Sequence, residues 1–175
     1  MNSKVWFAAL KYIVPTEMEY FLEEEAAEGW QLKPVGEMGL FYFEFVEAKP
    51  SKCRYVVDVT ALPKHLYMQT LSEKEWEYMG NSGNCHIWRK TYEETRPKDF
   101  ADRICRKNHC KRLGIAMLIF MVLCLAAALA LIWGYMYEGK MQAEGPRHVI
   151  YLVEAALQVP FILYFGWAAG KLLSR

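Results

Sequence analysis

The chain has 175 residues, and its 21 Lys and Arg against 20 Asp and Glu give a formal net charge of +1 at pH 7. Five cysteines, an odd number without a CxxC pair, argue against a disulfide framework and favour a reducing cytosolic environment. The mean hydropathy near zero is typical of a soluble protein, but it averages a charged first hundred residues and an apolar remainder.

The first hundred residues are enough for one small domain with its own core. A strand is expected over residues 4–12, and Pro15 ends it. The helix that follows begins with a capping-box pattern, Thr16 with Glu19, and should end at Gly29. Its polar face carries six glutamates, at 17, 19, 23, 24, 25 and 28. Because no His or Cys joins them at ligand spacing, we interpret this face as solvated.

Aromatic residues alternate along the next strands. Further strands are expected at 30–35, 40–46 and 55–59, a helix at 64–72, and a hairpin formed by 76–79 and 86–91. In the 40–46 strand, Phe41, Phe43 and Phe45 lie on one face.

The order of these elements repeats. Pro15 and Trp30 frame the first helix, and Pro63 and Trp76 frame the second. We therefore predict a duplicated strand–helix–strand–strand unit, an α+β fold with a mostly antiparallel sheet and both helices on one face. Trp30 and Trp76 should then occupy equivalent, largely buried places.

Several segments together resemble a known bacterial family. They are Gly29-Trp30 after an acidic helix, the aromatic strand 42–45, Tyr55-Val56-Val57-Asp58, Trp76-Glu77-Tyr78 and Ile87-Trp88-Arg89-Lys90. Over residues 4–90 they resemble domain of unknown function family 2812. The resemblance implies transmembrane helices after the domain and a frequent genetic association with PadR-type transcriptional regulators. It implies no established activity and supplies no catalytic residues.

A basic segment, 96–112, separates the domain (1–95) from the apolar part. We interpret its cations as a collar that binds lipid headgroups, each contributing about 1 kcal/mol near an anionic leaflet; they are Arg103, Arg106, Lys107, Lys111 and Arg112, with Lys98 before them. Nucleic-acid binding is disfavoured because no recognition motif accompanies the charge. Zinc binding by Cys105, His109 and Cys110 is disfavoured because their spacing is unusual and a fourth ligand is missing from the sequence pattern.

Residues 113–137 contain no charged side chain. As a helix they would extend about 37 Å, more than the roughly 30 Å of a bilayer's hydrocarbon core. A second span is predicted at 149–171, after an external loop (138–148) and before a short tail (172–175). Close to the membrane, Lys and Arg number six before the first span and two in the loop, and two more, Lys171 and Arg175, lie at and after the end of the second span. This bias predicts two spans in a bacterial plasma membrane with both termini cytoplasmic.

The two spans carry polar and small residues. Glu154 and Gln158 lie inside the second span, where Glu154 is shallow enough to reach interfacial water, so a structural role is favoured over transport. Two small-residue patterns could pack the hairpin together or form a homodimer, Ala126, Ala130 and Gly134 in the first span, and Gly166 and Gly170 in the second.

These features favour a membrane-anchored cytosolic binding or regulatory module without catalysis or cofactor, acting with a PadR-type regulator as the family resemblance implies. Direct nucleic-acid binding is not expected. The candidate ligand or partner surface is aromatic, comprising Phe41, Phe43, Phe45, Tyr55 and Trp88. The alternative is that these residues form the core. A second class of function is a small membrane enzyme or oligomeric transporter that uses Glu154 and Gln158, although no catalytic set or metal site is evident.

Overall fold

The computed structural model describes residues 2–6, 11–36, 39, 41–59, 65–140 and 147–174. The chain divides into two compact units, Met1–His109 and Cys110–Arg175, and each is described by itself. The predicted turn residues 37 and 38, the residue Pro63, and positions 141–146 of the predicted external loop lie outside the described residues.

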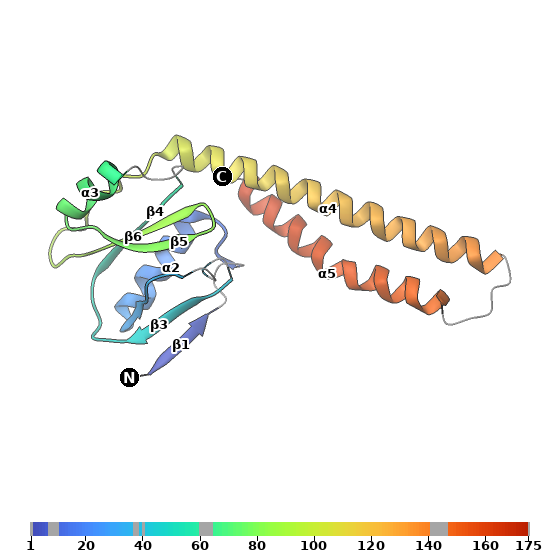
Figure 1. Cartoon of the computed structure of the whole chain (residues 1–175), viewed down its shortest axis with the longest axis horizontal. Helices are drawn as coiled ribbons and strands as arrows, with labels where there is room; N and C mark the ends of the chain where they lie inside the picture. The colour runs from blue at the N-terminus through green and yellow to red at the C-terminus, as the bar shows by residue number, and fades with distance from the viewer. Residues whose placement is uncertain are drawn as a thin grey trace. The chain divides into compact units, whose positions relative to one another are not determined.

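The first unit is an α+β domain with two three-stranded antiparallel sheets (Figure 1). Its elements are β1 (Ser3–Trp6), α2 (Pro15–Ala27), β2 (Trp30–Leu32), β3 (Phe43–Glu47), β4 (Cys53–Asp58), α3 (His65–Glu73), β5 (Glu77–Ser82) and β6 (Cys85–Thr91). The strand orders are β1-β3-β2 and β4-β6-β5, so in each sheet the third strand in sequence lies in the middle. The predicted duplication of a strand–helix–strand–strand unit is therefore confirmed.

A backbone bridge joins the two sheets. Val35 forms a parallel bridge with Gly80, and the Val35 amide donates a hydrogen bond to the Met79 carbonyl oxygen at 2.5 Å. Gly80 has a φ of 111°, and an added Cβ would lie 2.4 Å from the Val35 carbonyl oxygen. Glycine is thus required here both by the backbone conformation and by the close approach.

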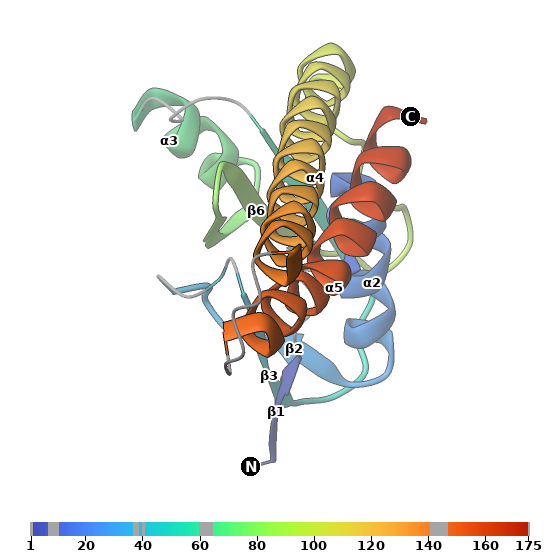
Figure 2. The same ribbon diagram turned by 90° about the vertical axis from the view of Figure 1, so that its right-hand side faces the viewer.

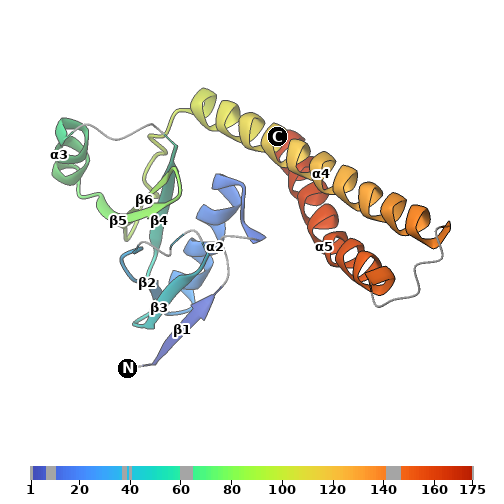
Figure 3. The same ribbon diagram turned by 45° about the vertical axis from the view of Figure 1, so that its right-hand side comes forward.

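Two apolar clusters show how the helices pack. The larger joins α2 to Phe43 and Phe45 of the first sheet and to Tyr55 and Val57 of the second. The smaller joins Val56 and Trp88 of the second sheet to α3. Successive strand residues point to opposite faces, so α2 and α3 cover opposite faces of the second sheet (Figure 3). The prediction of both helices on one face is wrong, because α2 packs between the sheets.

Local details also differ from the sequence-based expectations. Val14 is the N-cap of α2 and Pro15 occupies the first turn, and the helix has no side-chain cap, so the predicted Thr16–Glu19 capping box is absent. Glu19 is buried with 3% exposure, which corrects the interpretation of a wholly solvated acidic face. Trp30 begins β2 and Trp76 directly precedes β5, the equivalent strand, but Trp30 is half-buried whereas Trp76 is buried.

Two long helices follow. The helix α4 (Arg103–Lys140) begins within the first unit and continues without a break into the second, and α5 (Arg147–Leu173) contains Pro160. Both are long and apolar enough to cross a membrane, over Arg103–Tyr137 and Leu152–Leu173. Within the second unit they form a helical hairpin (Figure 1 and Figure 2).

Most of the small residues predicted to pack the two helices of the hairpin together do not lie between them. Leu172 and Leu173 lie against Gly114, and a Cβ on Gly166 would lie 3.2 Å from the Met121 sulfur. The half-buried or buried positions of α4 include 114, 117, 121, 124 and 128, the spacing of a coiled-coil seam. Ala126 and Ala130 fall outside this seam and are exposed, Gly134 is half-buried, and Gly170 faces open space. The small residues predicted in the first span therefore do not form the surface on which α4 and α5 pack together. Gly166 of the second span does lie on that surface.

Candidate functional site

The aromatic residues predicted as a docking surface are mostly core. Phe43, Phe45 and Tyr55 are at most 1% exposed in the cluster around α2, and Trp88 is 1% exposed in the cluster under α3. Of the five, Phe41 alone is exposed. The docking-surface prediction is wrong, because the two helices cover the strand faces that the alternation identified.

The structure instead gathers charged residues, three of them buried, where α4 begins. Six residues form this cluster, which we call the ionic junction, and all belong to the first unit: Glu19 and Glu23 on α2, Arg54 on β4, Arg96 and Asp99 after β6, and Arg106 in α4. The junction connects α2 and β4 to the start of α4.

The edge of β4 explains why the carboxylates lie here. Among the described strands, β4 has a neighbour on one side only, so alternate backbone groups need other partners. The Val57 amide donates to Glu19 Oε1 at 2.8 Å, and the Tyr55 amide donates to Glu23 Oε1 at 3.3 Å. Four residues along a helix advance about 6 Å, and two residues along a strand advance about 6.6 Å. Glu19 and Glu23 are therefore spaced along α2 as the amides of Tyr55 and Val57 are spaced along β4.

Two arginines complete the junction. Arg106 donates through Nη2 to Glu19 Oε1 at 2.6 Å, through Nη1 to Asp99 Oδ2 at 2.8 Å, and through Nε to the Val57 carbonyl oxygen at 3.0 Å. Arg54 donates to Glu19 Oε2 at 3.2 Å and to Glu23 Oε1 at 2.5 Å. Arg96 donates to Glu23 Oε2 at 2.8 Å at the solvent side. Every described polar contact of Glu19 is a donor, so the arrangement suits a carboxylate.

Burial makes this arrangement energetically demanding. The side chains of Glu19, Arg106 and Arg54 are only 4%, 8% and 9% exposed. Burial raises the pKa of Glu19, while Arg106, the Val57 amide and Arg54 oppose that shift by favouring the charged form. A buried charge that loses its partner is strongly destabilising, so the members of the junction depend on one another.

An aromatic contact reinforces the same segment. Phe100 lies between Asp99 and the start of α4, and its ring centroid is 4.9 Å from that of Trp76 and 6.3 Å from that of Trp88. Tyr67 of α3 contacts Phe100 at 6.5 Å. Charged and aromatic contacts together attach residues 96–106 to the domain.

The other predicted site residues lie elsewhere. Arg103, Lys107, Lys111 and Arg112 are exposed, as a headgroup-binding collar requires. Arg106 is not available to headgroups, because its guanidinium is directed into the domain, which corrects its assignment to the collar.

The polar residues of the second span differ in exposure. Glu154 is exposed on α5, whereas Gln158 has a buried Oε1 without a hydrogen-bond partner in the part of the chain that the structure describes. Among the described residues, no group of three His, Cys, Asp or Glu side chains could hold a metal ion.

Sequence reasoning missed the ionic junction. The spacing of Glu19 and Glu23 was visible in the sequence, but the other glutamates of α2 gave no way to recognise these two as the ones that meet a strand edge. Arg106 was hidden in the same way by its basic neighbours.

Comparisons with known proteins identify the family. No curated protein and no solved structure matches the chain. A family model described as "Protein of unknown function (DUF2812)" matches residues 15–123. The match begins later than the expected 4–90 and ends later, so it includes the whole ionic junction and the first part of α4. The match covers more than half of the chain, which therefore belongs to the DUF2812 family.

Proposed function

We propose that this protein is a membrane-anchored regulatory module in which a cytosolic α+β domain is coupled to its membrane helix through the ionic junction. The observation that carries the proposal is the buried pair of Glu19 and Arg106, which makes the first turns of α4 part of the domain. Because α4 is one continuous helix from Arg103 to Lys140, a change at the junction acts directly on the segment that enters the membrane.

The location in the membrane rests on two properties of the chain. Two helices have the length and composition of membrane spans. Lys and Arg are concentrated before the first span, and positive charge near a span is retained on the cytoplasmic side. Both termini then lie in the cytoplasm of a bacterium, where the domain can reach soluble partners.

The first partner to test is a PadR-type transcriptional regulator, which the family resemblance suggests. The buried aromatic residues do not offer it a docking surface. The junction offers a different mechanism: the domain binds the regulator when residues 96–106 are attached to it, and releases the regulator when they detach.

Arg106→Ala tests the coupling in the full-length protein in lipid nanodiscs. Loss of Arg106 removes three donors from the junction, so amide hydrogen exchange over residues 96–106 should accelerate at least tenfold. Arg103→Ala, an exposed position in the same helix, is the matched control and should exchange as the wild type does.

Co-purification with the PadR-type regulator encoded nearest to the gene tests the partner. Wild type and Arg103→Ala should retain the regulator equally, and Arg106→Ala should retain less. Equal exchange rates in the two variants would refute the coupling, and failure of the wild type to retain the regulator would refute the partner.

A further inference from the structure

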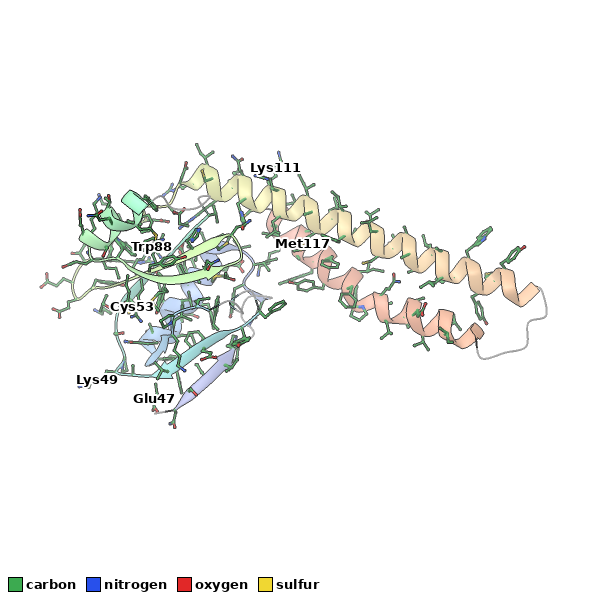
Figure 4. All side chains as sticks on the ribbon, viewed as in Figure 1. Glu47, Lys49, Cys53, Trp88, Lys111 and Met117 are labelled. Atoms are coloured by element: carbon green, nitrogen blue, oxygen red, sulfur yellow. The ribbon has the colours of Figure 1, made fainter. Side chains whose placement is uncertain are left out.

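A pocket of about 450 Å³ lies between α3 and the β5–β6 hairpin. Its lining residues are Met68, Gln69 and Ser72 of α3 with Trp76, Glu77, Tyr78 and Trp88 of the hairpin side. Figure 4 shows Trp88 on the hairpin where it faces α3. The volume is within the usual range of small-molecule sites, which are mostly apolar with a few polar groups.

The charges around this pocket favour a neutral ligand. Glu77 is the one charged lining residue, and its carboxylate already accepts from Arg89 Nη2 at 2.6 Å and Nε at 3.0 Å. The pocket therefore presents no unpaired formal charge among its described lining residues. A charged ligand would lose hydration without gaining an ion pair.

The side chains also favour a particular ligand shape. Three aromatic residues line the pocket, and Tyr78 is the exposed one, so its ring is available to stack on a planar ring system, while Trp88 packs against it with 5.0 Å between ring centroids.

The same two tryptophans connect this pocket to the ionic junction. Trp76 and Trp88 both contact Phe100, which follows Asp99, the partner of Arg106. A ligand that orders the two indoles also orders the residue next to the junction. We propose that this pocket binds a neutral, planar aromatic molecule, and that its binding stabilises the attachment of residues 96–106 to the domain. This inference rests on the proposed regulatory function and supplies its ligand class.

Fluorine NMR of the full-length protein in nanodiscs, labelled with fluorotryptophan, tests the site. The probe is carbostyril, a planar two-ring lactam, and single Trp→Phe substitutions assign the six tryptophan signals. Carbostyril should shift the Trp76 and Trp88 signals saturably and leave those of Trp133 and Trp167, on the two apolar helices, unchanged. Its fully saturated counterpart keeps the lactam but loses the aromatic plane, and should bind at least tenfold more weakly.

Two substitutions on α3 locate the binding. Ser72→Phe fills the pocket from an exposed position and should weaken carbostyril binding at least tenfold. Glu73→Phe adds the same ring at an exposed neighbour outside the pocket and should bind as the wild type does. Unchanged Trp6 and Trp30 signals verify that both variants are folded. The site is refuted if Trp76 and Trp88 do not shift saturably, if Ser72→Phe binds normally, or if the saturated lactam binds equally well.

Hydrogen exchange separates the ligand from the coupling. Saturating carbostyril should slow exchange over residues 96–106 at least threefold in the wild type, and Phe100→Ala should bind the probe but lose this effect. Unchanged exchange at saturation would refute the transmission. Absence of binding while Arg106→Ala still accelerates exchange refutes the pocket alone. Binding without any Arg106→Ala effect refutes the proposed coupling alone.

Discussion

The guanidinium of Arg106 donates to the carboxylate of Glu19 at 2.6 Å although 87 positions separate the two residues in the chain. The contact is buried on both sides and also involves the free edge of β4 through Val57. The start of α4 is therefore part of the domain's fold. The family match, which begins at residue 15 and ends at residue 123, includes both partners.

Glu19→Gln should destabilise the domain by about 3 kcal/mol, because it leaves two buried guanidinium groups without their shared carboxylate. The free energy of unfolding is measured by urea denaturation of the full-length protein in detergent. Domain tryptophan fluorescence reports unfolding in a background lacking Trp133 and Trp167. Glu24→Gln, exposed on the same helix, should change stability by less than about 0.5 kcal/mol. A Glu19→Gln protein that is as stable as the Glu24→Gln protein would contradict the energetic importance of the junction.

Local patterns were sufficient for much of the fold. The duplication followed from the repeated order of Pro, Trp and aromatic strands, and the two long apolar helices followed from composition. The alternation of Phe43 and Phe45 correctly identified one strand face. It could not show what covers that face, because the position of α2 between the sheets depends on contacts between residues far apart in sequence.

Gly80→Ala should cost more than about 2 kcal/mol of domain stability, since it adds a Cβ where φ is 111° and the Val35 carbonyl oxygen would lie 2.4 Å away. This substitution separates the two sheets at their bridge. Gly36→Ala is the control, because a methyl group added there would have no atom within 4 Å and the φ of Gly36 is not in the left-handed region. The same urea measurement compares them, and a Gly80→Ala protein as stable as Gly36→Ala would contradict the structural importance of the bridge.

Domain stability should fall on mild acidification because of His86. Burial lowers the pKa of His86 below its usual 6.5, against a smaller opposing effect of Asp58. The unfolded chain therefore takes up the proton first as the pH decreases. The stability associated with the neutral ring is present above about pH 6.5 and is lost as the pH falls through the lowered pKa.

The measurement for His86 is the urea midpoint at several pH values between about 7.5 and 5. His86→Gln keeps a neutral side chain throughout, so its midpoint should depend less on pH over this range. His109→Gln serves as a comparison for the general effect of losing a histidine. If His86→Gln and the wild type show the same pH dependence, another group is responsible.

The candidate site was harder to predict than the fold for a physical reason. Whether Arg106 faces lipid headgroups or the domain depends on Glu19 and on the unpaired edge of β4. The basic residues around Arg106 in the sequence indicate neither the position of Glu19 nor the unpaired edge of β4. Arg103 and Lys107 are also basic, but they are exposed because their side chains leave the helix in other directions.

Membrane topology gives the last prediction. The excess of Lys and Arg before the first span predicts that the termini lie in the cytoplasm, so position 143, between the two helices in the sequence, should be external. Cys53 is buried and would resist labelling on either side of the membrane, whereas Cys105 is exposed and is a suitable cytoplasmic reporter. Two single-cysteine proteins are therefore compared, one retaining Cys105 and one carrying Ala143→Cys. A membrane-impermeant maleimide should label Ala143→Cys in intact cells and Cys105 only after lysis, while a permeant maleimide labels both. Labelling of Cys105 but not of Ala143→Cys in intact cells would place the domain outside the cytoplasm, where it could not meet a transcriptional regulator.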